Sequence, residues 1–128
     1  MPRAVVTGGA GFLGANLCRR LLERGYDVVA VDDLSSGSVD HVRDLDADFD
    51  QGFELIVHDV VDGIPVHGPI DAVLHFASAA SPPHYLARPL ETLAVGSTGT
   101  RHALELARAT GARLLLASTS EVYGDPTE

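Results

Sequence analysis

The chain has 128 residues and a formal net charge of −9, with 45% hydrophobic and 21% charged residues, which suits one globular domain with a hydrophobic core. The acidic balance argues against nucleic acid as a main partner, because no basic face is available to neutralise phosphates. The only cysteine, Cys18, has no partner for an internal disulfide and is expected to be a small buried hydrophobe. No apolar run approaches the roughly 18 residues of a membrane span, and no signal peptide is visible after Met1, so the sequence predicts a cytoplasmic protein with no membrane partner.

A glycine-rich turn near the amino end is the most informative stretch. Residues 3–14 read as a short apolar strand, a turn and the start of a helix, with glycines at positions 8, 11 and 14. Gly8 allows a sharp turn out of the strand, Gly11 leaves no Cβ where the backbone approaches a phosphate, and Gly14 lets the helix lie close to the strand. Free N–H groups at the helix start, with the positive end of the helix dipole behind them, favour an anion. The stretch therefore predicts a pyrophosphate site formed by Gly8, Gly11, Phe12, Leu13 and Gly14.

The helix that follows this turn is amphipathic. Leu13, Leu17 and Leu21 recur at every fourth position, with Cys18 and Leu22 beside them, which predicts one buried stripe along the helix. Gly25 comes directly after the pattern and is expected to cap the carboxyl end of the helix. A single buried stripe is what a helix needs to pack on one face of a sheet.

An acidic residue follows the second predicted strand, residues 27–31. Asp32 comes about 20 residues after the last glycine, where a carboxylate can hold both ribose hydroxyls of an adenosine. Asp33 follows it and no arginine or lysine is adjacent, so a 2′-phosphate would be repelled. We therefore expect NAD rather than NADP as the cofactor. The alternative is a solvated loop in which the two aspartates only form turns.

Three more strands and one long helix are predicted along the rest of the chain. A short helix would fit residues 39–45, strands are expected at residues 53–58, 71–76 and 113–118, and the long helix at residues 89–110. Gly96 and Gly99 inside the long helix cost about 1 kcal/mol each relative to alanine, which suggests close packing or a ligand nearby. The residues expected on one face of this helix are Leu90, Leu93, Ser97, Thr100, Leu104 and Ala107.

The acidic residues and the histidines give no metal motif. Aspartates alternate with other residues from Asp44 to Asp50, but the glycine and glutamate that a calcium loop needs at its sixth and twelfth positions are missing. The six histidines show no zinc-ligand spacing. We therefore predict no metal site.

Helices that alternate with strands predict an α/β fold. Right-handed crossovers make it a doubly wound, Rossmann-type parallel sheet with strand order 3-2-1-4-5, in which residues 1–128 form one NAD-binding domain. The ligand cleft is then expected at the carboxyl ends of strands one and four. Asp59 and Val60 follow the third strand and are placed to meet an adenine ring by a hydrogen bond and an apolar contact. After Phe76, the small residues at 77–81, with Ala77 and Ser78 first, let another molecule approach the backbone.

Several of these motifs occur together in a known family. The chain contains Thr7-Gly8-x-x-Gly11-x-x-Gly14, Asp32, Asp59-Val60, His75-x-Ala77 and Ser118-Thr119-Ser120-Glu121-Val122-Tyr123-Gly124. This set resembles the extended short-chain dehydrogenase/reductases that act on nucleotide sugars. Residues 80–85 and 112–126 are most similar to the UDP-glucuronate decarboxylase (UDP-xylose synthase) branch. The resemblance covers the whole chain but only the amino-terminal part of such an enzyme, so the later strands and the substrate domain are expected to be missing.

The resemblance implies NAD as the cofactor and a UDP-sugar as the substrate. In the family, NAD takes a hydride from C4 of the sugar and later returns it, and the β-keto acid formed in between loses CO2. The resemblance gives Thr119 a hydrogen bond to the 4-oxygen and places Glu121 near C5. Ser120 stands where related 4,6-dehydratases have an aspartate, which favours decarboxylation over dehydration. Taken alone, the hydroxyls of Thr119 and Ser120 are equally well explained as turn formers bonded to the backbone.

Three departures from the family bear on activity. The Tyr-x-x-x-Lys pair is missing, because all nine basic residues are arginines and none of the three tyrosines precedes a lysine. The family usually has asparagines at the positions of Gly96 and His102. His75 is interpreted as a structural residue packed near the cofactor. We expect the chain alone to be catalytically inactive.

Two other interpretations stay open. The chain could be a short NAD-binding module that senses the cofactor or scaffolds a partner, which Gly96 and the missing lysines favour. It could instead be part of a nucleotide-sugar 4-epimerase or 4,6-dehydratase. In each case residues 114–117 form an apolar edge strand beside an exposed helix face, which predicts homo-oligomers or a complementing chain.

Overall fold

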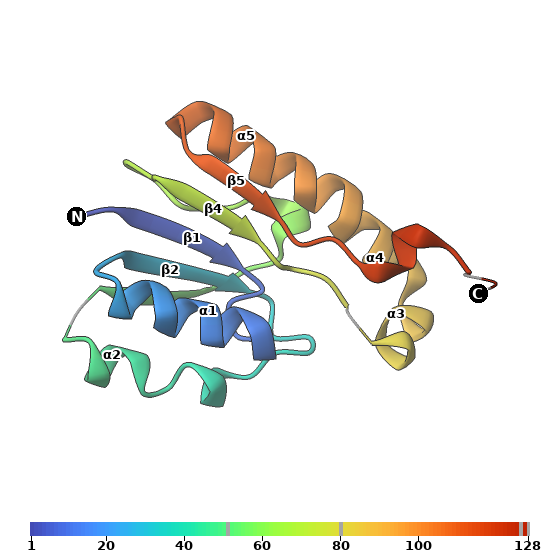
Figure 1. The fold of residues 1–128 in the computed structure, drawn as a ribbon, viewed down its shortest axis with the longest axis horizontal. Coiled ribbons are helices and arrows are strands. Elements are labelled where there is room, and N and C mark those ends of the chain that lie inside the picture. Colours follow the sequence, from blue (N-terminus) through green and yellow to red (C-terminus); the bar gives the residue numbers. More distant parts are fainter. Residues whose placement is uncertain (51, 80, 126, 128) are drawn as a thin grey trace.

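The computed structural model describes residues 1–50, 52–79, 81–125 and 127, in which strands alternate with helices (Figure 1). The strands are β1 (Arg3–Thr7), β2 (Asp27–Asp32), β3 (Phe53–Val57), β4 (Ala72–His75) and β5 (Arg113–Leu116). The α-helices are α1 (Phe12–Glu23), α2 (Leu45–Asp48), α3 (Pro82–Ala87), α4 (Pro89–Ala94) and α5 (Thr100–Thr110). Shorter helical turns are η1 (Val39–His41), η2 (Val60–Asp62), the π-helical η3 (Val95–Gly99) and η4 (Ser120–Tyr123).

The five strands form one parallel sheet in the order β3-β2-β1-β4-β5, which confirms the predicted doubly wound, Rossmann-type topology (Figure 1). The chain first builds the sheet outward from β1 through β2 to β3. It then returns to the other side of β1 and adds β4 and β5. The direction of winding therefore reverses between β1 and β4, where a cleft for ligands is expected at the carboxyl ends of the strands.

Side chains of the central strands alternate between two apolar clusters on opposite faces of the sheet. Ala4 and Val6 of β1 pack in the cluster that contains the α1 residues, whereas Val5 packs in the cluster that contains the α5 residues. Strands buried on both faces read as continuous apolar runs, and this is why β1, β2 and β4 were recognisable in the sequence. The result is three layers, with α1 and α5 on opposite faces of the sheet.

The buried stripe of α1 is the predicted one except at its first residue, Leu13. Leu13 is 64% exposed, and the buried side chains of α1 are those of Ala15, Cys18 and Leu22. Leu17 and Leu21 are partly buried and pack against the same cluster, so only Leu13, in the first turn of the helix, departs from the prediction. The predicted cap is confirmed: Gly25 has a φ of +84°, and its N–H group bonds the Leu22 carbonyl at 2.9 Å.

The short helix predicted at residues 39–45 is wrong. The segment instead forms the single turn η1, capped by the Ser38 hydroxyl, which accepts the Asp40 N–H, and the helix α2 begins only at Leu45. Val42 and Leu45 are buried in the cluster beneath α1. Burying both of these side chains fixes the chain at two points and interrupts the helical path between them.

The long helix predicted at residues 89–110 is present as the consecutive segments α4, η3 and α5, but its buried face differs from the expected one. Of that face, Leu90, Leu93 and Leu104 are exposed and Ala107 is buried, and Ala103, which was not expected there, is buried as well. Small residues allow α5 to sit close to the sheet, and the larger leucines are left outside. Within the part of the chain that the structure describes, no helix is both long and apolar enough to cross a membrane.

The two glycines of the π-helical segment predict opposite effects of substitution. A Cβ at Gly99 would lie 2.8 Å from Val60 Cγ2, while a Cβ at Gly96 would meet nothing within 4 Å. We expect Gly99→Ala to destabilise the chain by about 1–3 kcal/mol through overpacking. Gly96→Ala is its matched control and is expected to stabilise by up to about 1 kcal/mol through helix propensity. Denaturant unfolding of both variants measures the difference, and equal effects would contradict it.

Cys18 is expected to be chemically inert in the folded chain. Burial raises the pKa of its thiol from 9.0 to about 12, so almost no thiolate forms near neutral pH. In the unfolded chain the thiol ionises at its ordinary pKa, so stability falls as the pH rises from 9.0 towards about 12. We predict no alkylation by iodoacetamide at about pH 8 until denaturant is added. Mass spectrometry would detect labelling of the native chain, which would contradict this assignment.

The edge strand β5 predicts self-association. Within the described sheet β5 pairs only with β4, and its Leu115 and Leu116 are about half exposed (52% and 51%). A flat apolar edge of this kind invites pairing with another chain. We expect dimers or higher oligomers by light scattering at tens of micromolar, and Leu116→Lys is expected to shift the chain towards the monomer. A monodisperse monomer without that substitution would contradict the prediction.

Candidate functional site

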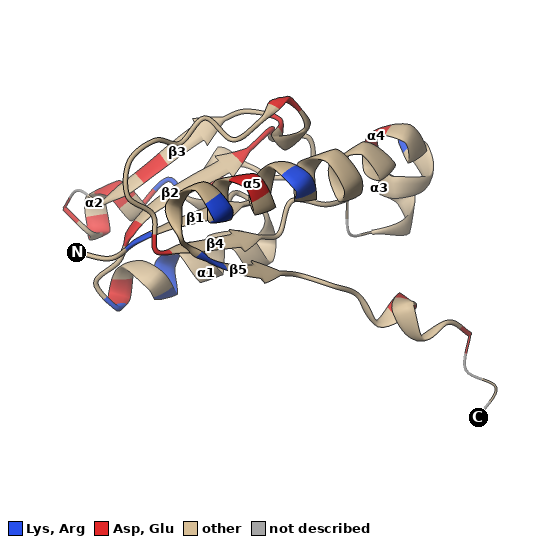
Figure 2. Cartoon of the chain, turned by 90° about the horizontal axis from the view of Figure 1, so that it is seen from above, with Lys and Arg blue, Asp and Glu red and all other residues tan. Residues whose placement is uncertain are grey.

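The predicted site residues gather at one edge of the sheet. Because the strands are parallel and paired in register, the glycine turn after β1, Asp32 at the end of β2 and the segments after β3 and β4 all lie at the carboxyl ends. The segment after β5 starts at the same edge but then leaves the body of the domain (Figure 2). The edge therefore brings together the predicted cofactor residues more closely than the predicted catalytic ones.

Two of the three turn glycines are required by backbone contacts. Gly8 has a φ of +70°, and a Cβ there would lie 2.8 Å from the Phe76 carbonyl. A Cβ at Gly14 would lie 2.0 Å from the Gly8 carbonyl oxygen, whereas at Gly11 the nearest atom would be 3.3 Å away. Because Gly8 has no Cβ, the turn can pack against the segment after β4. Because Gly14 has none, α1 can pack against the turn. Gly11 is the glycine whose outward side is free for a ligand.

The positive end of the α1 dipole lies at the amino end of the helix, and no acidic side chain in its first turn offsets it. Its N-cap residue is Gly11, which makes no side-chain cap, and its first turn contains no acidic residue. The first N–H groups of a helix have no partner inside the helix. Phe12 and Leu13 occupy this first turn with exposed side chains. The turn can therefore bind an anion through its backbone.

Asp32 fastens the glycine turn to the end of β2. Its side chain is buried, with Oδ2 accepting the Ala10 N–H at 2.9 Å and Oδ1 accepting the Leu34 N–H at 2.8 Å. Each carboxylate oxygen keeps a second lone pair, which is free to accept a hydroxyl proton. Asp33 is exposed and only forms a turn, since its Oδ1 accepts the N–H and hydroxyl of Ser35. The two aspartates thus differ: Asp32 is buried and tied to the glycine turn, whereas Asp33 is exposed and bonds only Ser35.

A buried polar pair joins β1 to β4 beneath the turn. The Thr7 hydroxyl oxygen accepts the N–H groups of Phe76 at 3.1 Å and Ala77 at 3.2 Å. Its hydrogen is then left for His75 Nδ1, 2.7 Å away. Burial lowers the pKa of His75, which favours the neutral ring that can accept this hydrogen. This arrangement supports the structural interpretation of His75, and it fixes the backbone at Phe76 and Ala77.

The residues after β3 and β4 differ in what they offer a ligand. The Val60 side chain is 4% exposed and packs against Gly99, so it belongs to the core. Asp59 is half-buried and uses Oδ1 to accept the Val61 N–H at 3.0 Å, which leaves its other oxygen available. Ser78 is exposed at the edge. Ala80 and Pro126, which belong to segments used in the sequence comparison, lie outside the described residues.

The predicted catalytic residues are exposed. The Thr119 hydroxyl accepts the Glu121 N–H at 3.2 Å, so it caps η4 as a turn former, and Ser120 begins that turn. Glu121 Oε1 accepts the hydroxyl of Tyr85 on α3 at 3.3 Å. Partial burial and the Glu121 carboxylate raise the pKa of Tyr85, which keeps the phenol protonated near neutral pH. The structure thus brings α3 and η4 together in a way that sequence reasoning missed.

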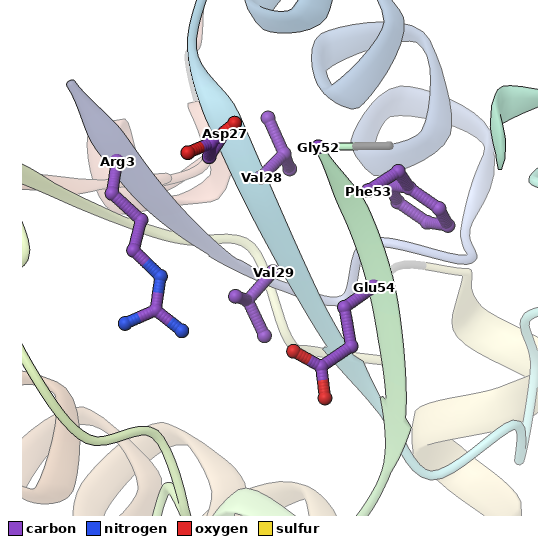
Figure 3. A pocket seen from close by; sticks show the side chains of 7 residues that line it. All are labelled: Arg3, Asp27, Val28, Val29, Gly52, Phe53 and Glu54. Atoms are coloured by element: carbon purple, nitrogen blue, oxygen red, sulfur yellow. The ribbon is translucent and has the colours of Figure 1, made fainter. Parts of the chain in front are cut away.

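Two hollows of the described surface lie away from this edge or at its margin. The larger, about 230 Å³, is at the amino ends of β1, β2 and β3, where Arg3 and Glu54 flank the apolar side chain of Val29 (Figure 3). A second, about 140 Å³, lies beside the start of α1 between Phe12 and His41. Among the described residues no cluster of histidine, cysteine and acidic side chains could hold a metal ion.

The fold and the glycine turn are those of a Rossmann-type dinucleotide-binding domain. The chain belongs to the NAD dependent epimerase/dehydratase family, whose pattern matches residues 4–128. It is 47% identical over 124 residues to UDP-glucuronic acid decarboxylase 1 of Danio rerio, covering 97% of this chain and 29% of that protein. The resemblance to the nucleotide-sugar branch of the extended short-chain dehydrogenase/reductases is therefore confirmed.

Solved structures of epimerases share this fold. A UDP-galactose 4-epimerase is 39% identical, with a TM-score of 0.80 over 98% of this chain and 41% of its own. A UDP-glucose-4-epimerase from Stenotrophomonas maltophila, solved with bound NAD and formylated UDP-arabinopyranose, is 28% identical, with a TM-score of 0.83 over 100% of this chain and 40% of its own. The chain thus spans well under half of the relatives it matches.

Proposed function

We propose that this chain is the NAD-binding portion of a nucleotide-sugar-modifying enzyme of the UDP-glucuronate decarboxylase type. The observation that carries the proposal is the uncapped start of α1 behind a glycine turn that buried Asp32 ties to β2. Identity of 47% to a UDP-glucuronic acid decarboxylase supports the branch. The chain has no lysine, so we propose that it is inactive alone and that the tyrosine and lysine of the family come from outside these 128 residues.

The chain's own residues have distinct roles in this proposal. The N–H groups at Phe12 and Leu13 hold the pyrophosphate, and the free lone pairs of Asp32 accept the ribose hydroxyls. Asp59 reaches the adenine, and the backbone at Phe76, Ala77 and Ser78 borders the nicotinamide half. The bound cofactor supplies the hydride chemistry at C4 of the sugar.

The predicted catalytic segment would act on the sugar. Thr119 holds the 4-oxygen, Glu121 lies near C5 and Ser120 completes the turn between them. In the described chain Thr119 and Glu121 are already engaged, with each other and with Tyr85. The hydroxyl hydrogen of Thr119 and Oε2 of Glu121 are not used in these bonds, so they are the groups that we propose meet a bound UDP-sugar.

Calorimetric titration of the purified chain with NAD and with NADP tests the cofactor assignment. We expect one saturable site for NAD and much weaker binding of NADP, because Asp32 and Asp33 would repel a 2′-phosphate. Circular dichroism on the same sample reports whether the chain is folded. A folded chain that gives no heat with NAD would overturn the proposal.

A second candidate is an NAD-binding sensor or scaffold without catalysis, which the missing lysine and Gly96 favour. A Tyr-x-x-x-Lys sequence further along the same gene, or in a complementing chain that restores activity, would rule it out. A third is a 4-epimerase or 4,6-dehydratase, which the 39% identity to a UDP-galactose 4-epimerase favours. Product analysis on UDP-glucuronate with the completed enzyme separates this candidate from the decarboxylase.

A further inference from the structure

A contact between α5 and the turn after β3 carries a further inference. The carbonyl oxygen of Val60 lies 2.7 Å from Nδ1 of His102, which is 42 positions further along the chain. The same oxygen accepts the Gly63 N–H at 3.2 Å, so both of its lone pairs are used. Because a carbonyl oxygen can only accept, Nδ1 of His102 must carry a hydrogen. The hydrogen bond to the main-chain oxygen of Val60 therefore requires that Nδ1 carries a hydrogen.

The side chain of the same residue, Val60, packs against Gly99. Gly99 lies three positions before His102 on the helical segment, so both face η2, and a Cβ at Gly99 would come within 2.8 Å of Val60 Cγ2. The Val60 side chain is thus pressed against the helix at Gly99 while its carbonyl is bonded by His102. Two independent contacts on a single residue fix its position and its rotation.

The turn that these contacts hold has little structure of its own. η2 is one turn of three residues, and the chain from Gly63 to Asp71 forms no helix or strand. A single turn is not stable alone, so its orientation depends on what packs against it. Asp59 is the N-cap residue of η2, and its Oδ1 accepts the Val61 N–H. The direction of its free oxygen is therefore set by the orientation of η2.

We infer that His102 is a positioning residue of the cofactor edge, which bonds the Val60 carbonyl and thereby aims the Asp59 carboxylate at the adenine. The inference rests on the proposed function, since it names the adenine as what Asp59 meets. His102 itself lies on α5 and is not assigned a contact with the cofactor. Its effect on binding is transmitted through the main chain of η2.

Three variants test this role. His102→Leu removes the donor and keeps an apolar side chain, while His102→Asn keeps a donor, because its Nδ2 can take the place of Nδ1. Arg108→Leu is the control, an exposed residue on the same helix. We expect His102→Leu to weaken the binding of NAD and of ADP-ribose by the same factor. The factor is about three- to tenfold, as for one lost hydrogen bond. His102→Asn and Arg108→Leu are expected to bind within about twofold of the unaltered chain.

Nuclear magnetic resonance on the ligand-free chain tests the contact itself. Long-range proton–nitrogen correlations are expected to place the hydrogen of His102 on Nδ1. Amide exchange at Val61 and Asp62 is expected to be faster in His102→Leu and unchanged in His102→Asn. A neutral ring protonated only on Nε2, or a leucine variant that binds NAD as well as the unaltered chain, would overturn the inference. If the unaltered chain bound no NAD, the proposed function would fail, while these ligand-free measurements would still decide whether the contact exists.

Discussion

Gly14→Ala is expected to destabilise the folded chain by about 3 kcal/mol or more, and to abolish binding of NAD as a result. The new Cβ would lie 2.0 Å from the Gly8 carbonyl oxygen and 2.9 Å from the Cα of Gly9. All of the crowded atoms belong to the backbone, which cannot rotate away as a side chain can. Either α1 must move off the sheet or the glycine turn must open, and both would expose buried surface. Denaturant unfolding monitored by circular dichroism measures the loss.

Gly11→Ala is the matched control, because it adds the same methyl group to the same turn. Its Cβ would lie 3.3 Å from the Gly8 oxygen, and Gly11 has no left-handed φ, so a shift of a few tenths of an ångström accommodates it. We expect a loss of about 1 kcal/mol or less, since alanine is a poorer N-cap residue than glycine. NAD should nevertheless bind more weakly, because this methyl group would face the proposed pyrophosphate site. Equal stabilities for the two variants would show that Gly14 is not a packing glycine.

The topology was predictable because it depends on the order of apolar runs along the chain. The buried faces of α1 and α5 were predictable only in part. Strand order followed from parallel strands and right-handed crossovers, which need only the element sequence. Leu13 and Leu104 were placed on buried faces but are exposed, because hydrophobicity does not say how closely a helix approaches a sheet. Along η3 and α5 that distance is set by small residues, Gly99, Ala103 and Ala107, which recur at every fourth position and were a readable signal.

The sequence was enough to place Gly8, Gly14 and Asp32 at one edge of the sheet, but not to find the contacts that support this edge. Gly8, Gly14 and Asp32 each occupy a position where the local chain geometry demands their chemistry. The bonds of Thr7 to His75 and of Val60 to His102 join residues 68 and 42 positions apart. No local pattern encodes such pairs, since their distance depends on how the sheet and α5 pack. Tyr85 was missed for the same reason, because it meets Glu121 only through the placement of α3.

Asp32→Asn is expected to separate the structural role of this carboxylate from its proposed role in binding. In the folded chain its two oxygens each accept one backbone N–H, from Ala10 and from Leu34. Asparagine can accept only one of them, and its amide group would face the other N–H in a buried place. Leaving that donor unpaired costs about 1–3 kcal/mol, so the variant should still fold at low temperature. Thermal unfolding measures this cost.

On the folded variant, affinity for NAD is expected to fall about tenfold or more, because a neutral amide accepts ribose hydroxyls less strongly than a carboxylate. Affinity for NADP should fall much less, since a charge that repels the 2′-phosphate is removed at the same time. Asp33→Asn is the control: this exposed neighbour bonds only Ser35, so NAD should bind almost unchanged. If Asp32→Asn lost stability but kept its preference for NAD over NADP, the carboxylate of Asp32 would only stabilise the glycine turn. Other residues on this edge would then have to select the cofactor.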